Sequence, residues 1–287
     1  MKLIKPSFEI LEQGFSVNAI YKHIELCGRT CYKSNDKITK DSAKPFVDRM
    51  IKSGHDSILE HGTIYLKITC KNPDFGILCI FYGKNKYSVL NHSEDNKIYY
   101  ITTNYRVLVE NNRISDLKYL CEPTDIHEKR ITVKFICNRQ ISHEFVRHRV
   151  FSFAQESTRY CNYTKDKFGK ELTFIQPCWI NEEYVSGDYS KSDEFIMFTE
   201  MLENIESTYN YMIYNGWKPQ QAATILPNAL KTELVMTGFI KDWKHFFNLR
   251  AIGTTGTPHP QAKELAEPLM KEFINRKYIS YDTECMV

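Results

Sequence analysis

Apolar and polar positions alternate in some parts of the chain and recur every three or four residues in others. Alternation predicts strands at 63–69 and 131–136, and strand-like composition predicts two more at 99–109 and 232–237. Helices are predicted at 14–31, 193–215, 241–250 and 261–276. Pro219 is placed to open a further short helix that ends at Leu226-Pro227.

Polar segments separate these elements. Residues 84–97 are predicted to form an exposed loop, and 253–260, which contain two Gly and two Pro, a second one. Neither an internal repeat nor a low-complexity linker marks a domain boundary. Because strands and helices are mixed without a strict β-α-β rhythm, the pattern favours an α+β fold over a doubly wound one.

Composition narrows the class of protein. Of the 287 residues, 42% are hydrophobic, 25% are charged and 13% are aromatic, which is typical of a globular chain and argues against disorder or a fibre. The net charge of +3 is too small to indicate a nucleic-acid or membrane partner. The longest apolar run, 75–82, is far shorter than the ~20 residues that a membrane-spanning helix needs.

Cysteine usage indicates a reducing compartment. The nine cysteines are odd in number, scattered and without a Cys-x-x-Cys pair, so neither a disulfide framework nor a structural zinc site is expected. The N-terminus has no apolar signal core. We therefore expect a cytoplasmic protein that binds no metal.

The densest chemistry lies in residues 144–160. If a helix from about residue 139 continued through this segment, Arg147 and Arg149 would project ~200° apart, so at least one must leave the helix surface to serve something else. An extended backbone would place Ser157 and Arg159 on one face. A hydroxyl beside a guanidinium is a natural phosphate clamp.

Other interpretations of this segment remain open. Arg147 and Arg149 are also compatible with solvated surface charges, and His148 with an interior histidine. A nucleic-acid patch usually needs a stronger basic excess, so a compact site for a small polyanion fits better. His143 and His148 are five residues apart and would diverge around a helix, which excludes a zinc-protease site, and Cys178 is expected to be a buried structural thiol.

Several motifs resemble one known family, the flavin-dependent thymidylate synthases (ThyX). They occur in the family's order between about residues 27 and 273. The motifs are His55-x-Ser57-x-x-Glu60-His61, Arg147-His148-Arg149-x-x-Ser152, Ser157-x-Arg159-Tyr160, Leu226-Pro227 with Lys231-Thr232-Glu233, and Phe246-Phe247-Asn248-Leu249-Arg250.

The resemblance implies a methyltransferase of nucleotide biosynthesis. Such an enzyme converts dUMP to dTMP, with methylenetetrahydrofolate as one-carbon donor and NADPH as reductant through bound FAD. It implies a single domain over residues 1–287, a mixed sheet flanked by long helices, with 84–129 as an elaboration between core strands. It also implies a homotetramer that shares its active sites between subunits, with no nucleic-acid or membrane partner.

The resemblance also implies roles for individual residues. The catalytic residues would be Arg250, which faces the uracil, and Ser157, which positions the substrate and does not attack it. The FAD contacts would be His55, Ser57, Arg147, His148, Arg149, Gln155, Lys241 and His245. The dUMP contacts would be Glu144, Arg147, Gln155, Glu156, Ser157, Thr158, Arg159 and Arg250.

The chain departs from the family pattern at several positions. Glu144 stands where Gln is common, and Ala223 replaces an Arg that contacts the nucleotide, a loss for which Lys218 or Lys231 could compensate. The missing Arg leaves two alternatives open. One is a degenerate flavoprotein of the same fold that acts as an NADPH oxidase, and the other is a basic nucleic-acid-binding module.

Overall fold

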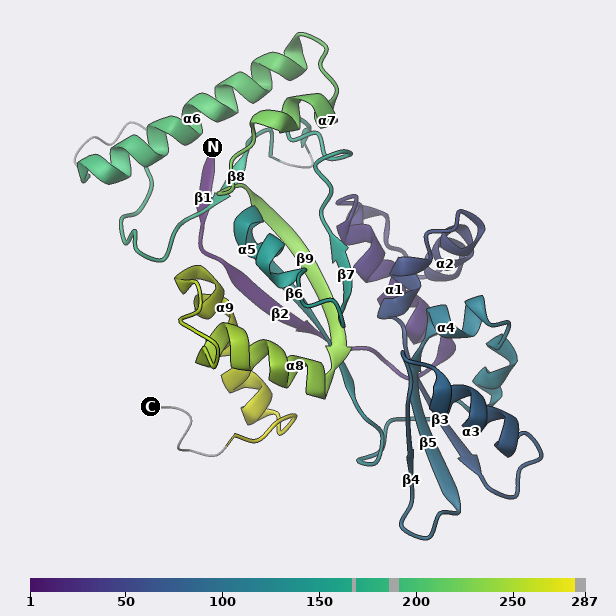
Figure 1. Cartoon of the computed structure of the whole chain (residues 1–287). Coiled ribbons are helices and arrows are strands. Elements are labelled where there is room, and N and C mark those ends of the chain that lie inside the picture. Colours follow the sequence, from purple (N-terminus) through teal and green to yellow (C-terminus); the bar gives the residue numbers. More distant parts are fainter. Residues whose placement is uncertain (167–168, 186–190, 282–287) are drawn as a thin grey trace.

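A four-stranded antiparallel sheet forms the centre of the chain, as Figure 1 shows. The computed structural model describes residues 1–166, 169–185 and 191–281. The strands are β2 (Ser7–Leu11), β6 (Arg130–Asn138), β9 (Lys231–Phe239) and β7 (Ser152–Gln155), in that order across the sheet. The nine-residue strands β6 and β9 pair along their whole length, with Val133 opposite Met236.

Three helices cover one face of this sheet and form the main core with it. They are α5 (Arg139–Phe145), α8 (Ile240–Phe247) and α9 (Pro260–Asn275). Alternation along β6 points Val133, Phe135 and Cys137 into this core. Asn138 ends the strand and starts α5, because its side chain accepts a hydrogen bond from the backbone N–H of Ile141 at 2.8 Å.

Helix α1 (Val17–Thr30) and the 3-10 turn η2 (Asp56–His61) lie against the other face. Val235 of β9 and Ala154 of β7 pack there against Cys27 of α1. Because Leu234 and Met236 belong to the first core, β9 is buried on both faces. Such a strand is central to the fold rather than an edge.

A second sheet, three-stranded and antiparallel, lies beyond α1, at the lower right in Figure 1. Its order is β3 (Thr63–Thr69), β5 (Ile98–Asn104) and β4 (Val89–His92). It shares a core with α1 and with α2 (Ala43–Lys52), α3 (Phe75–Lys84) and α4 (Tyr105–Glu110). The remaining short turns of this half are η1 (Asn35–Lys37) and η3 (Ile114–Tyr119).

The opposite end of the chain's fold is built around the long helix α6 (Asp193–Tyr214), at the top in Figure 1. It packs with α7 (Pro219–Ala222) and η5 (Ala223–Ile225). Below it β1 (Lys2–Ile4) pairs in parallel with β8 (Thr173–Ile175). Leu202, Tyr209, Phe174 and Cys161 form the core of this end.

The structure corrects several predictions. In place of one mixed sheet, the described residues form three sheets, each of a single sense. The predicted strand at 99–109 ends at Asn104, whose side chain caps α4 by accepting from Val107 N at 3.1 Å. The predicted loop at 84–97 contains strand β4, because Val89–His92 pair with β5.

The structure also places the apolar run and corrects one expectation about the cysteines. The run at 75–82 forms most of α3, whose Ile77 and Ile80 are exposed. Cys178 is only partly buried, so the expected core thiol is wrong. Cys178 and the other described cysteines form no disulfide bond with one another, and Cys285 lies outside the described residues. None of the described helices is both long and apolar enough to cross a bilayer.

Replacing Gly238 of β9 by Ala is predicted to destabilise the fold. A Cβ there would lie 2.5 Å from two ring atoms of Phe151, and that ring is buried and packs on Trp243 with centroids 4.7 Å apart. Overpacking of this kind costs about 1–3 kcal/mol. Chemical denaturation measures the loss of unfolding free energy. The control is Gly76→Ala in α3, where a Cβ meets nothing within 4 Å and stability should hold or rise.

Candidate functional site

The segment Arg147-His148-Arg149 follows α5 rather than continuing it. The helix ends at Phe145, and the next turn is held by hydrogen bonds from His148 N to Phe145 O at 3.1 Å and from Arg149 N to Arg147 O at 2.9 Å. Arg147 and Arg149 are exposed, whereas His148 between them is buried. The expectation that at least one arginine leaves the helix surface is confirmed, since both lie beyond it.

Arg250 comes to this segment from a different part of the chain. It lies in the short π-helix η6 (Asn248–Ile252), which continues α8 and ends at Gly253, where φ is 84°. Its guanidinium donates to the Glu144 carboxylate at 2.6 Å, to the Glu144 carbonyl at 3.1 Å and to His148 Nε2 at 3.2 Å. Arg250 and Glu144 line a hollow of about 510 Å³ together with the loop at 255–259.

His148 is a neutral imidazole in this arrangement. Burial, the Arg250 charge and His245 together lower its pKa from 6.5 to about 4. Because Arg250 Nε donates to Nε2, the ring proton lies on Nδ1. The segment therefore presents two cations flanking a neutral ring, not three positive charges.

Three more of the predicted site residues lie on elements that pack around this group, and one of them, His245, contacts it. The His245 ring centroid is 6.0 Å from that of His148, and Lys241 stands one helical turn earlier on α8. Both side chains are exposed. Gln155 of β7 donates to Ser142 of α5 at 2.9 Å and to Thr232 of β9 at 3.3 Å, so its amide joins strand and helix.

The predicted phosphate clamp lies at the far end of β7. Residues 157–160 form a turn, not the extended backbone expected, because Tyr160 N and Cys161 N both donate to the Ser157 carbonyl, at 3.2 and 3.0 Å. Ser157 and Arg159 therefore do not share a face through strand alternation. Arg159 is exposed and donates from Nε to Gln220 of α7 at 3.3 Å.

The upstream motif is on the other face of the central sheet. His55 and Ser57 are exposed at the start of η2, which packs against β7. His61 of the same motif is buried and bonds Thr237 of β9 at 2.8 Å, which makes it a core contact. In the part of the chain that the structure describes, no contact joins His55 or Ser57 to Arg250.

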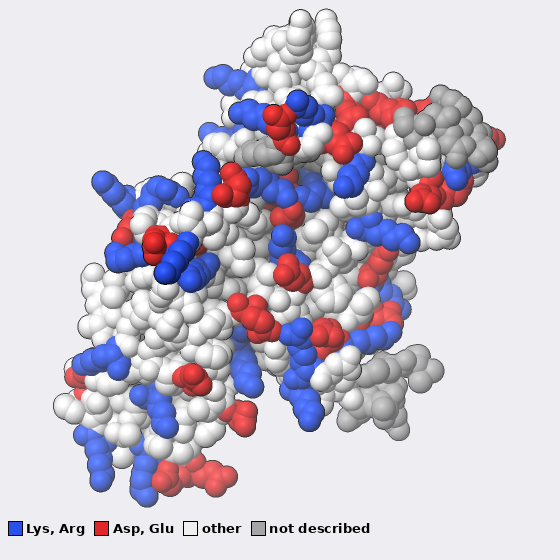
Figure 2. All heavy atoms as spheres, turned by 180° about the vertical axis from the view of Figure 1, so that it is seen from behind, with Lys and Arg blue, Asp and Glu red and all other residues white. Residues whose placement is uncertain are grey.

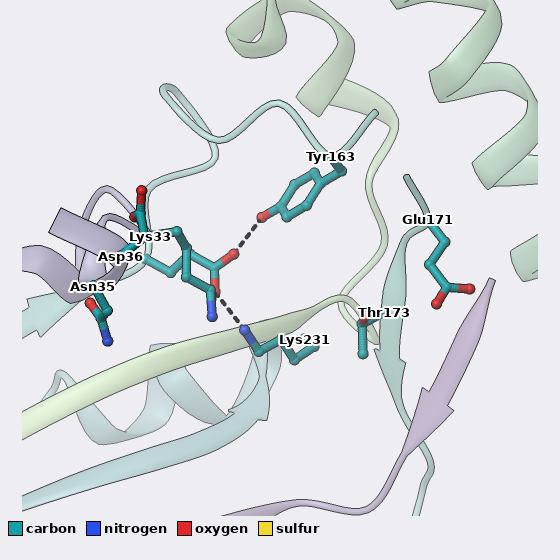
Figure 3. A pocket seen from close by; sticks show the side chains of 8 residues that line it. Lys33, Asn35, Asp36, Tyr163, Glu171, Thr173 and Lys231 are labelled. Carbon is teal, nitrogen blue, oxygen red and sulfur yellow. Dashed lines mark hydrogen bonds and ion pairs between the residues drawn. The ribbon is translucent and has the colours of Figure 1, made fainter. Parts of the chain in front are cut away.

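A cavity of about 370 Å³ adjoins the clamp, and sequence analysis missed most of its residues. Figure 3 shows Tyr163 and Lys231 with dashed lines to the carboxylate of Glu156, and Glu156 is 2% exposed. The sequence held one signal for this cluster of charges: Lys231 and Glu233 are two apart on a strand, so their side chains lie on the same face.

The surface charges are mixed. Seen from behind (Figure 2), Lys and Arg gather together with Asp and Glu, and this face has no continuous basic surface.

Comparison with known proteins places these residues in a family. A family model described as "Thymidylate synthase complementing protein" (Thy1) matches residues 124–276, more than half of the chain. The matched part holds both arginines of the Arg147–Arg149 segment, the turn at 157–160 and Arg250. The chain belongs to this family, the flavin-dependent thymidylate synthases.

Individual relatives are distant. The flavin-dependent thymidylate synthase of Pyrococcus furiosus is 32% identical over 114 residues, which span 40% of this chain and 43% of that protein. That of Corynebacterium aurimucosum is 24% identical over 258 residues, or 87% and 75% of the two chains. The crystal structure of the UMP/dUMP methylase PolB from Streptomyces cacaoi, bound with 5-Br dUMP, aligns over 96% of this chain and 93% of its own at 15% identity, with a TM-score of 0.46.

Removing the charge of Arg250 is predicted to raise the pKa of His148. In Arg250→Met the guanidinium no longer opposes protonation of His148, and the freed Glu144 carboxylate favours it. Burial still opposes protonation, so the pKa should rise from about 4 without passing its ordinary 6.5. An NMR pH titration of the imidazole measures it. Arg149→Met should leave the value unchanged, and an unchanged value in Arg250→Met would contradict the geometry described.

Proposed function

We propose that the chain is a flavin-dependent thymidylate synthase that converts dUMP to dTMP. In this proposal methylenetetrahydrofolate supplies the one-carbon unit and NADPH reduces bound FAD. The observation that carries the proposal is the convergence of Arg250, Glu144 and neutral His148 beside two exposed arginines.

Arg250 is the proposed catalytic group. Its guanidinium is anchored at two points by Glu144 and keeps a fixed direction, while part of it remains open to the hollow at 255–259. A preorganised cation stabilises negative charge that develops on a pyrimidine ring as C5 becomes nucleophilic. Glu144 is placed to orient Arg250 and to accept a hydrogen bond from the base.

The exposed cations fit an anionic cofactor such as FAD. Arg147 and Arg149 have no partner among the described residues, and a guanidinium binds phosphate oxygens with a bidentate fork. Neutral His148 can donate only from Nδ1, so it orients and does not add charge. His245 lies beside His148, and Lys241 and Gln155 are proposed as further FAD contacts. FAD, when bound, would carry the hydride chemistry, and these residues would hold it in place.

The turn at 157–160 is the proposed nucleotide phosphate site. It offers the Ser157 and Thr158 hydroxyls and the exposed Arg159 guanidinium within four consecutive residues. Ser157 acts here as a positioning group, because no described side chain bonds its hydroxyl as an activating base would.

A homotetramer with shared sites is part of the proposal. The Arg250 group, the clamp and His55 with Ser57 belong to three separate regions of one chain, so a complete site calls for contributions from more than one copy. The single domain with 84–129 as an elaboration, and a cytoplasmic location, stay predictions.

One feature favours a second candidate. Ala223, in η5, supplies no cation where the family commonly has an Arg, which suits a flavoprotein that has lost methyl transfer and oxidises NADPH. The nucleic-acid-binding module has no such support, because the chain belongs to an enzyme family; such a module would be colourless and bind oligonucleotides in a salt-dependent way.

Anaerobic incubation with FAD, NADPH, dUMP and methylenetetrahydrofolate is expected to yield dTMP. Arg250→Ala should abolish dTMP formation and keep most of the flavin absorbance, because its target is the pyrimidine. Flavin reduction by NADPH with no dTMP in the unaltered protein would instead indicate the oxidase. Normal turnover by Arg250→Ala would refute the role given to Arg250.

Arg159→Ala is expected to weaken dUMP binding. A lost charge-assisted phosphate contact is worth ~1.5–3 kcal/mol, or ~10- to 150-fold in the dUMP requirement. Titration of the flavin spectrum with dUMP measures the affinity. Lys44→Ala, which removes an exposed cation on α2 paired with Asp48, serves as control and should not change it. Equal affinity in both variants would exclude the clamp.

A further inference from the structure

Buried charges lie beneath the proposed phosphate turn. Lys231 Nζ is 2.8 Å from Glu156 Oε2 and 2.9 Å from Glu233 Oε1. The Tyr163 hydroxyl donates to Glu156 Oε1 at 3.0 Å, and Lys33 forms a further ion pair with Glu233. Figure 3 shows Lys33, Lys231 and Tyr163 converging on this place from separate segments. These five residues are called the charge network here.

Such a network is costly unless every charge is paired. Burial alone would raise the pKa of Glu233, but Lys231, Lys33 and Lys134, whose Nζ is 3.2 Å from it, lower that pKa to about 2. Burial likewise opposes the charge of Lys231, and the two glutamates outweigh it and raise its pKa. Glu233 and Lys231 are therefore charged at neutral pH, and because these ion pairs are buried, removal of one partner leaves the other uncompensated.

Lys33 reaches the network through a backbone conformation that disfavours it. Its φ is +48°, in the left-handed region, which is sterically unfavourable for any residue with a Cβ and not for glycine. The ion pair between Lys33 and Glu233 offsets this conformational cost. The end of α1 is thereby attached to β9 through a side chain.

The network is attached to the phosphate turn by the chain itself. Glu156 immediately precedes Ser157, and its backbone N–H donates to the Glu233 carbonyl at 2.9 Å. The next N–H, of Ser157, donates to the Cys31 carbonyl at 3.0 Å, two residues before Lys33. The start of the turn is therefore bonded to β9 and to the segment after α1. Backbone hydrogen bonds and side-chain ion pairs both contribute.

We propose that Glu156 is a positioning residue, whose buried carboxylate, clamped by Lys231 and Tyr163, holds the turn at 157–160 in the conformation that binds the nucleotide phosphate. In this role Glu156 acts through the turn, and not as the direct dUMP contact that the resemblance implies. That the turn binds phosphate rests on the proposed function. That Glu156 restrains the turn does not depend on it. Lys231 then offsets the missing Arg at Ala223 by rigidifying the turn, not by contacting the nucleotide.

Glu156→Gln tests this, because the amide keeps the shape and removes the charge. Hydrogen exchange of the protein without nucleotide should show amides of 156–161 exchanging at least ~10-fold faster. The KM for dUMP should rise by a similar factor, while kcat at saturating dUMP and the flavin absorbance change less than about threefold. Glu171→Gln is the matched control. Glu171 lines the same cavity and pairs with the N-terminal amine at 3.8 Å, but it does not adjoin the turn at 157–160.

A second variant separates positioning from general stability. Glu156→Gln with Lys231→Met removes both charges, so the unfolding free energy should recover while the fast exchange and the high KM persist. Recovery of KM together with stability, or unchanged exchange in Glu156→Gln, would overturn the proposal. If the unaltered protein forms no dTMP, the proposed function fails, and the exchange measurement still decides whether Glu156 holds the turn.

Discussion

The nine-residue antiparallel pairing of β6 with β9 is the constraint on which the site depends. Helix α5 starts where β6 ends, at Asn138 opposite Lys231, and α8 starts where β9 ends, at Phe239 opposite Arg130. The two helices thus enter one face of the sheet from opposite ends. They meet at Phe145 and Phe246, whose ring centroids are 5.0 Å apart. This encounter brings together Glu144 and Arg250, which are 106 positions apart in the chain.

How far the sequence predicts this arrangement depends on the range of the interactions. The strands at 131–136 and 232–237 were predictable because local composition and alternation already mark them, and the structure extends both to nine residues. The end of the strand at Asn104 was not predictable, because the Asn104 side chain caps a helix where β-branched neighbours suggest that the strand continues. The turn at 157–160 was likewise assigned the wrong backbone, because its carbonyl contacts are invisible in composition.

The candidate site divides in the same way. Arg147, His148, Arg149 and Arg250 were found through family motifs, and the contact between Arg250 and His148 follows from the helix crossing. The charge network was missed because it unites Lys33 with Glu233, 200 positions away, and each residue alone resembles an ordinary surface charge. Long-range pairs between common residue types leave no trace in a single sequence, whereas Lys231 and Glu233 at strand spacing leave a weak one.

The contact between Gly238 and Phe151 has a consequence for how this fold varies. The ring lies where a side chain at 238 would stand, so the two positions share one volume. A larger residue at 238 is compatible only with a smaller one at 151, and the ring at 151 also packs beside His148, with centroids 6.3 Å apart. Side-chain size at a buried strand position is therefore coupled to the environment of the imidazole. Change at these two positions must be concerted.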